Sequence, residues 1–216
     1  MRFQLGVLDV DGTLVAVESW PYFHERLGTT AQARRYAELY RRGLITYEEW
    51  ARLEASLWRG LPKALLRRLA EEAPLVPGAR EAIQALRAHG VELVLLSCGV
   101  DVMVEVVAEE LGIQRYVANE LLTDQHGLLT GQVNVRIPLD GKLRVLRALL
   151  EELGIEPARC FAVGDDETMV PVLRFVGLGI AFNPRSTRVA RAAHVVVQAP
   201  DLRAILPYVL GPGKGY

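Results

Sequence analysis

The pattern of hydrophobic and polar positions divides the chain into three stretches. The first residues form a short apolar run, residues 18–73 show helical periodicity, and the remainder alternates short apolar runs with helical patterns. Short apolar runs bounded by turn residues are typical of buried strands, and helices between such strands are typical of a parallel sheet covered on both faces. The pattern therefore predicts an α/β fold.

Individual elements follow from the same pattern. The predicted strands are residues 3–8, 91–96, 117–122, 128–135, 160–163, 178–182 and 194–197, the third and fourth of which form a hairpin. The predicted helices after residue 77 are 79–89, 101–111, 142–153, 170–175, 186–193 and a terminal helix from residue 202. Residues 18–73 predict about three helices with no strand between them.

These elements predict how the chain is organised. We expect a three-layer, Rossmann-like core domain with a parallel sheet, formed by residues 1–14 and 77–216. Residues 15–76 are expected to form a small helical cap domain inserted into this core.

Composition excludes several classes of protein. The 216-residue chain has a net charge of −1, which gives no general attraction to nucleic acids or anionic membranes. No apolar run reaches the roughly 18 residues of a membrane span, and the N-terminus lacks the pattern of a signal peptide. Two cysteines give no disulfide framework. We therefore expect a cytoplasmic monomer or homodimer with no nucleic-acid or membrane partner.

Polar residues follow three of the predicted strands. Asp9 and Asp11 come after the first strand, Ser97-Cys98-Gly99 after the second, and Asp165-Asp166 after the fifth. Each group alone fits a turn or a helix cap. The carboxyl ends of parallel strands meet at one edge of the sheet, where ligands bind. Together these residues therefore predict a binding site.

Lys142 strengthens that prediction. Only three of the 25 basic residues are lysine, and Lys142 opens a predicted helix. A cation at a helix N-terminus opposes the helix dipole at a cost of a few tenths of a kcal/mol. A compact ammonium in this position indicates a nearby anion. The other lysines, Lys63 and Lys214, lie in polar segments and are expected to be solvated.

The chemistry of these groups indicates phosphoryl transfer. Several carboxylates at one edge suit Mg²⁺, which binds carboxylates together with substrate phosphate. A hydroxyl, backbone N–H groups and the N-terminus of the next helix suit a phosphate group. One carboxylate can act as a nucleophile and a neighbour as acid and base. The expected partner is a small phosphorylated metabolite.

The segment "DVDGTLV" (residues 9–15) resembles the D-x-D-G-T motif of the haloacid dehalogenase (HAD) superfamily. Ser97, Lys142 and "VGDD" (residues 163–166) fall where the second, third and fourth motifs of that superfamily belong. Nearly the whole chain resembles the phosphoserine phosphatases, which are HAD phosphatases with a helical, C1-type cap. The resemblance implies an Mg²⁺-dependent phosphomonoesterase whose cap closes over the substrate.

The resemblance also implies roles for single residues. Asp9 would be the nucleophile that becomes an aspartyl-phosphate, and Asp11 would protonate the leaving oxygen and activate water. Lys142 would pair with Asp9 and the phosphate. The phosphoryl oxygens would be held by Ser97 and the backbone of Cys98 and Gly99. The Mg²⁺ ligands would be Asp9, the backbone carbonyl of Asp11, and Asp165.

The chain departs from the family at the fourth motif. The family carries a second aspartate four residues after the first, but this chain has Met169 there. We expect Asp166 to replace it at the metal, with a loop acid that points away as the alternative. Thr168 takes the place of a family Asn near the phosphate, and we expect it to contact the substrate.

A second departure concerns the substrate. Glu18 matches the family residue that binds the substrate ammonium. Glu54 stands where the family has an Arg that binds the substrate carboxylate, and a Glu would repel that group. Arg52 cannot substitute, because residues two apart on a helix point in different directions. We therefore expect a phosphorylated amine, alcohol or sugar without a carboxylate.

Other functions remain open on the sequence. The chain could be a phosphoserine phosphatase proper, or a non-catalytic protein that binds a phosphate ligand on a degenerate HAD scaffold, for which Met169 is the best support. Asp11 disfavours dehalogenation, which has no leaving oxygen to protonate. Several aromatic side chains could line the cap's substrate face, but a structural core is the favoured interpretation for them: Trp20, Tyr22, Phe23, His24, Tyr47, Trp50 and Trp58.

Overall fold

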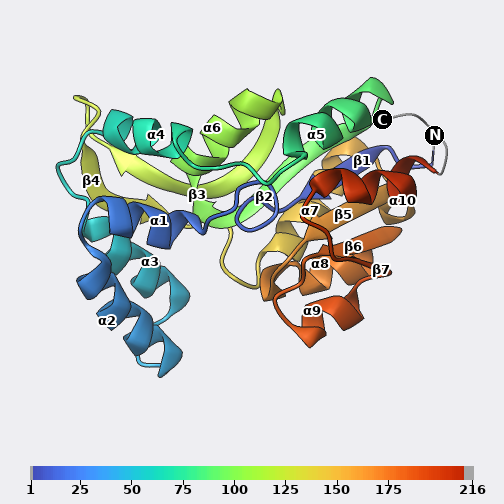
Figure 1. Ribbon diagram of the computed structural model, residues 1–216. Coiled ribbons are helices and arrows are strands. Elements are labelled where there is room, and N and C mark those ends of the chain that lie inside the picture. The colour runs from blue at the N-terminus through green and yellow to red at the C-terminus, as the bar shows by residue number, and fades with distance from the viewer. Residues whose placement is uncertain (1, 212–216) are drawn as a thin grey trace.

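The centre of the protein is a seven-stranded sheet, which the computed structural model describes within residues 2–211 (Figure 1). The strand order is β4-β3-β2-β1-β5-β6-β7. Neighbouring strands are parallel except for the antiparallel hairpin β3–β4. The strands are β1 (Leu5–Leu8), β2 (Glu92–Val100), β3 (Arg115–Thr123), β4 (Leu129–Asn134), β5 (Cys160–Gly164), β6 (Leu178–Phe182) and β7 (Val195–Val197). The predicted α/β fold is confirmed.

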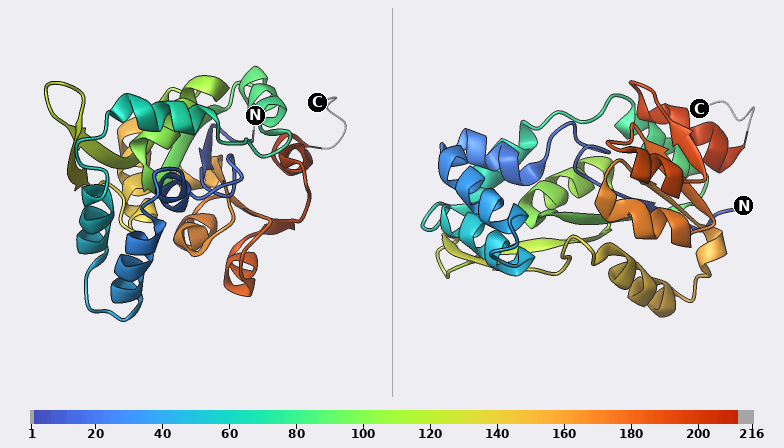
Figure 2. Two further views of the ribbon diagram at one scale, coloured as in Figure 1. Left: turned by 60° about the vertical axis from the view of Figure 1, so that its left-hand side comes forward. Right: turned by 90° about the horizontal axis from the view of Figure 1, so that it is seen from below.

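Helices cover both faces of the sheet and create two hydrophobic cores. The first core contains helices α5 (Ala79–Ala88), α6 (Asp101–Leu111) and α10 (Leu206–Leu210). The second contains α7 (Lys142–Leu153), α8 (Val170–Phe175) and α9 (Thr187–Ala192). Figure 2 shows α7 on the side of the sheet opposite to α5 and α10.

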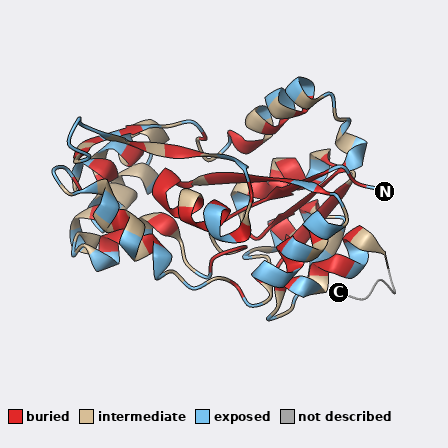
Figure 3. Cartoon of the chain, turned by 90° about the horizontal axis from the view of Figure 1, so that it is seen from above, coloured by how far each residue is buried: buried red, intermediate tan, exposed pale blue. Residues whose placement is uncertain are grey.

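Strand β5 shows how one strand serves both cores. Cys160 and Ala162 belong to the second core, whereas Phe161 and Val163 belong to the first. Successive side chains of a strand point to opposite faces, so a strand in the middle of a three-layer fold must be apolar at every position. Figure 3 shows the central strands as largely buried. This is why a continuous apolar run predicted the strand.

Four helices lie between β1 and α5 in the described chain, at the end of the sheet where the β3–β4 hairpin extends (Figure 1). They are α1 (Ser19–Arg26), α2 (Thr30–Arg41), α3 (Tyr47–Ser56) and α4 (Lys63–Glu71), and we call them the cap helices. The expected number was about three, because the break at Gly28, with φ of 70°, was not recognised. Helix α3 begins with a capping box between Thr46 and Glu49.

Lys63 connects the cap helices to the rest of the fold. Its Nζ lies 2.6 Å from Oδ2 of the buried Asp101, and the Lys63 side chain is 27% exposed. The expectation of a solvated Lys63 is therefore wrong, because α4 packs beside α6. Lys214 lies outside the described residues. None of the helices within residues 2–211 combines the length and the apolar character needed to cross a bilayer.

Candidate active site

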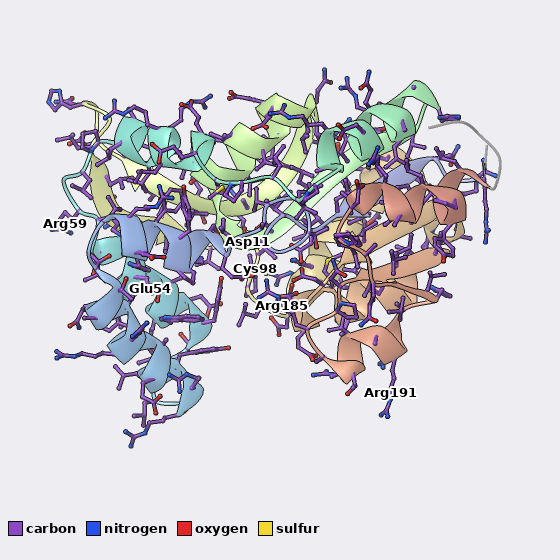
Figure 4. All side chains as sticks on the ribbon, in the orientation of Figure 1. Asp11, Glu54, Arg59, Cys98, Arg185 and Arg191 are labelled. Carbon is purple, nitrogen blue, oxygen red and sulfur yellow. The ribbon has the colours of Figure 1, made fainter. Side chains whose placement is uncertain are left out.

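The candidate site lies where the carboxyl ends of β1, β2 and β5 meet. Strand β1 lies between β2 and β5, and the strand order reverses there, with β2, β3 and β4 on one side and β5, β6 and β7 on the other. Open α/β sheets bind ligands at such a reversal. The backbone N–H of Asp9 donates to the carbonyl of Val163 at 3.0 Å, which sets the two strand ends side by side. Figure 4 labels Asp11, Cys98 and Arg185 in the region between the cap helices and the C-terminal part of the sheet.

Asp9 and Lys142 form a buried ion pair. Lys142 Nζ lies 2.6 Å from Asp9 Oδ1, and neither side chain is more than 4% exposed. Burial raises the pKa of Asp9 to about 7 despite the attraction of Lys142, and repulsion from Asp166 and Asp165 adds to the rise. Burial alone would lower the pKa of Lys142, but the attraction of Asp9 outweighs it and the pKa is raised. The structure thus brings together the two residues that the sequence paired.

Asp11 is held by the first residue of α1. Its Oδ2 accepts hydrogen bonds from the backbone N–H and the hydroxyl of Ser19, at 2.8 and 2.7 Å. Its Oδ1 is buried without a partner in the described structure. Burial and repulsion from Glu18 raise the pKa of Asp11 to about 7, against the hydrogen bonds from Ser19. A carboxyl group with that pKa suits proton transfer near neutral pH. Sequence reasoning missed Ser19, whose visible signal was only its place at a helix start.

Ser97, Cys98 and Gly99 form the irregular end of β2, where its pairing with β3 shifts register, and are here called the 97–99 loop. They pack tightly against Asp11. Ser97 Oγ accepts a hydrogen bond from the Gly99 N–H at 2.9 Å. A Cβ on Gly99 would lie 2.2 Å from Ser19 Oγ and 3.0 Å from Asp11 Oδ2. No side chain fits in this space, so Gly99 is required for the close approach of the loop to Asp11.

The carbonyl of Cys98 anchors this loop to three other elements. It accepts hydrogen bonds from Trp20 Nε1 at 3.3 Å, from the Tyr47 hydroxyl at 3.0 Å and from Asn119 Nδ2 at 2.8 Å. Trp20 and Tyr47 come from cap helices, so the cap and the loop are held in one arrangement. Burial raises the pKa of the Cys98 thiol to about 12, so it is a neutral thiol rather than a reactive thiolate at neutral pH. Asn119 carried no recognisable signal in the sequence.

Both carboxylate oxygens of Asp165 accept hydrogen bonds from other side chains. Its Oδ1 accepts from the Thr13 hydroxyl at 3.0 Å, and its Oδ2 accepts from Arg185 Nε at 2.6 Å. The same Arg185 forms an ion pair with Glu18 at the start of the cap helices. Arg185 follows β6, far from either partner in sequence, and no sequence pattern indicated it.

Asp166 faces the cavity described below, but one of its oxygens caps the following turn. Its Oδ1 accepts from the backbone N–H and the hydroxyl of Thr168, at 2.9 and 2.6 Å. Met169 is fully buried in the second core and packs against Gly164. Met169 therefore contributes nothing to the site, as the sequence indicated, and Asp166 has one oxygen left to face a ligand.

The carboxylates of the site are chemically suited to a hard divalent cation. The described residues contain no cluster of three or more His, Cys, Asp or Glu side chains that could hold a metal ion, and Arg185 is paired with Asp165. The donors are nevertheless all oxygen, Asp11 has a buried oxygen without a partner, and repulsion between Asp9 and its acidic neighbours raises the Asp9 pKa. A cation such as Mg²⁺ would relieve that repulsion.

A cavity of about 570 Å³ separates the cap helices from the sheet edge. Ten of the predicted site residues line it: Asp9, Asp11, Glu18, Glu54, Ser97, Cys98, Gly99, Lys142, Asp166 and Thr168. Among the predicted site residues, Asp165 does not line it. Glu54 lies on its wall and Arg52 on the same helix is exposed instead, as the helical spacing predicted.

The aromatic residues divide between the core and the cavity. Tyr22, Phe23 and Trp58 are buried in the first core, as expected. The cavity wall contains Trp20, His24, Tyr47 and Trp50, which is the alternative position that the sequence left open for them. The difference arises because α1 and α3 each present one face to the core and an adjacent face to the cavity.

The comparisons with known proteins agree with this arrangement. Residues 7–174 match the sequence model of the haloacid dehalogenase-like hydrolases. A phosphoserine phosphatase of Streptomyces coelicolor is 32% identical over 210 residues, which are 96% of this chain and 50% of that protein. A phosphoserine phosphatase of Albidiferax ferrireducens is 31% identical, over 94% of this chain and 88% of that protein. The chain spans about half the length of several of its relatives.

Solved structures show the same fold. The structure of a phospho-aspartyl intermediate analogue of phosphoserine phosphatase matches with a TM-score of 0.81 and 27% identity, over 96% of this chain and 99% of that one. A HAD family hydrolase from Salmonella enterica matches with a TM-score of 0.85 at 21% identity, which supports the fold alone. The D-x-D-G-T segment, the paired Asp9 and Lys142, and the extent of these matches lead to one conclusion: the chain belongs to the haloacid dehalogenase-like hydrolase family.

Proposed function

We propose that the protein hydrolyses a small phosphomonoester in an Mg²⁺-dependent reaction through a phosphoryl intermediate on Asp9. The observation that carries this proposal is the buried Asp9–Lys142 pair at the floor of a cavity, beside the 97–99 loop. Family membership and the names of the relatives support it. A carboxylate beside a fixed cation is suited to attack on an anionic phosphoryl group.

In the proposed reaction Asp9 attacks phosphorus while the substrate's P–O bond breaks. Asp11 donates a proton to the leaving oxygen, and in the second half it takes a proton from the water that attacks the phosphoryl-Asp9. The P–O bond to Asp9 then breaks and inorganic phosphate leaves. Lys142, the Ser97 hydroxyl and the backbone of the 97–99 loop hold the phosphoryl oxygens. Mg²⁺ bound by Asp9, Asp11 and Asp165 would supply positive charge that neutralises the phosphate oxygens.

The cap helices, residues 15–76 in our division of the chain, are proposed to exclude water from this reaction. They form the wall opposite the sheet edge, and Trp20 and Tyr47 hold them to the carbonyl of Cys98. Opening and closing of such a cap admits substrate and protects the phosphoryl intermediate. In this arrangement Asp166 and Thr168 border the cavity near the reacting groups.

The substrate is proposed to lack a carboxylate. Glu54 lines the cavity where a carboxylate-binding cation would be needed, which favours a phosphorylated amine, alcohol or sugar. Phosphoserine remains a second candidate, because the relatives carry the name phosphoserine phosphatase and because Arg34 lies at the rim of the same cavity.

Hydrolysis of p-nitrophenyl phosphate with and without Mg²⁺ tests the proposal. We expect turnover that depends on Mg²⁺ and that disappears in Asp9→Asn, with an unchanged circular dichroism spectrum. Absence of turnover in folded, Mg²⁺-supplied wild type would overturn it in favour of a phosphate-binding protein. Unchanged turnover in Asp9→Asn would refute the role of Asp9.

A further inference from the structure

The cap wall of the cavity contains a carboxylate that the proposed hydrolysis does not use. Glu54 is only 4% exposed and lines the cavity, and no hydrogen bond to its side chain is found among the described residues. Glu54 Oε2 lies 3.6 Å from His24 Nε2, a distance too long for a good hydrogen bond. Figure 4 labels Glu54 on the side of the cap helices. Because Glu54 is on the cavity wall, its carboxylate is available to accept hydrogen bonds from a ligand in the cavity.

The groups around Glu54 suit a cation. His24 Nε2 and Trp50 Nε1 are buried without hydrogen-bond partners in the described structure, and both residues line the cavity. Trp50 Nε1 can only donate, so it suits an acceptor atom of the ligand, and it is the faces of the indole rings that suit a cation. Trp50 stacks on Tyr40, and Trp20 stacks on Trp58, so each of the two lining indoles is fixed by a ring behind it. The faces of fixed indole rings attract cations.

The charge of the cavity lining and the cavity volume also suit a small cationic ligand. Apart from the groups assigned to the phosphate and the metal, the cavity is lined by three acidic residues, Glu18, Glu25 and Glu54, and by one basic residue, Arg34. Glu18 is already paired with Arg185, and Arg34 is exposed at the rim, so the buried charge of the wall is negative. The cavity of about 570 Å³ is within the range of roughly 300–1,000 Å³ that is typical of ligand pockets.

We propose that Glu54 binds a protonated amino group of the substrate, and that the enzyme acts on phosphorylated amines that carry no carboxylate. The inference rests on the proposed phosphomonoesterase function and narrows its substrate class. The phosphate group of the substrate lies at Asp9 and Lys142. Its ammonium group reaches the cap wall and donates a hydrogen bond to the Glu54 carboxylate. A substrate carboxylate beside the nitrogen would face Glu54 and be repelled.

A matched panel of substrates tests this directly. ω-Aminoalkyl phosphates of increasing chain length are compared with the n-alkyl phosphates of the same length and with phosphoserine, all with Mg²⁺. We expect kcat/KM for the best amine to exceed that of its n-alkyl partner by about 10- to 100-fold, the worth of a buried hydrogen bond to a charged group. We expect phosphoserine to fall below 2-aminoethyl phosphate, which differs from it by the carboxylate alone.

Two variants separate recognition from structure. Glu54→Gln should reduce the ratio of amine to n-alkyl turnover by about tenfold or more, whereas Glu48→Gln should leave the ratio unchanged. Glu48 is on the same helix and does not line the cavity. Thermal unfolding of both variants checks that they fold.

The outcomes distinguish this inference from the function on which it rests. If no phosphate ester is hydrolysed, the proposed function fails. If n-alkyl phosphates and p-nitrophenyl phosphate are hydrolysed but amines gain no preference, or phosphoserine is the best substrate, the role of Glu54 is refuted and the phosphatase stands. A wild-type preference for amines that survives Glu54→Gln also refutes it.

Discussion

Removing the charge of Lys142 should destabilise the protein strongly, because its partner is left buried. Lys142 Nζ and Asp9 Oδ1 are 2.6 Å apart and both side chains are almost fully inaccessible to water. Breaking one side of such a pair typically costs about 3–5 kcal/mol, because the other charge stays desolvated. For a chain of this size that cost corresponds to a fall in Tm of about 6–20 °C.

The experiment is urea unfolding of wild type and Lys142→Met, with EDTA present so that metal binding does not contribute. Lys63→Met is the matched control, because Lys63 is also paired with a buried aspartate but is 27% exposed. The free energy of unfolding of Lys63→Met should fall by less, about 1–2 kcal/mol, because solvent screens Lys63 in part and Asp101 keeps its hydrogen bonds from the N–H groups of Val102 and Leu121. Adding Asp9→Asn to Lys142→Met should recover most of the lost stability, because no charge then remains to be desolvated.

The pH dependence provides a second check on the cause. Burial raises the pKa of Asp9 to about 7 even with Lys142 in place, and without Lys142 it rises further. The folded protein therefore binds a proton at Asp9 more readily than the unfolded chain does, so lowering the pH from 8 to 5 favours folding. The difference in free energy of unfolding between wild type and Lys142→Met, here called the deficit, should therefore shrink from pH 8 to pH 5. A deficit below 1 kcal/mol at pH 8, or one that is equal at pH 5 and pH 8, would refute the reasoning.

Three further substitutions test other contacts of the site. Gly99→Ala should lower kcat/KM for p-nitrophenyl phosphate by about 10- to 100-fold, because its Cβ displaces the Ser19 hydroxyl 2.2 Å away; near-wild-type turnover would contradict this. Arg185→Gln should lower severalfold the Mg²⁺ concentration that gives half-maximal thermal stabilisation, because Arg185 no longer occupies Asp165; an unchanged midpoint would show that the ion pair does not compete with the metal. Tyr47→Phe should lower the Tm by about 2–8 °C, because its hydroxyl donates to the Cys98 carbonyl and accepts from Asn119 Nδ2, and no change would show that the hydroxyl does not hold the cap.

The order of strands and helices was predictable because it depends on local patterns. Strand β5 is buried on both faces, so every position is apolar and the run is recognisable in isolation. The capping box of Thr46 and Glu49 also lies within four consecutive residues. The position of Gly28 as a helix break was missed, because a single glycine in a helical pattern does not by itself specify an end.

The sequence by itself determined which groups carry the chemistry: the position of Asp9, Asp11 and Lys142 follows from strand ends that must meet at one edge of a parallel sheet. The tertiary structure decided their partners. Arg185 reaches both Asp165 and Glu18, and Asn119 holds the 97–99 loop, through contacts between elements that no local pattern connects. Glu54 is a charged residue on a helix in the sequence, and only the packing of α3 places it on the cavity wall. Burial and pairing depend on what a fold brings near a side chain, and that is settled by long-range packing rather than by the residue itself.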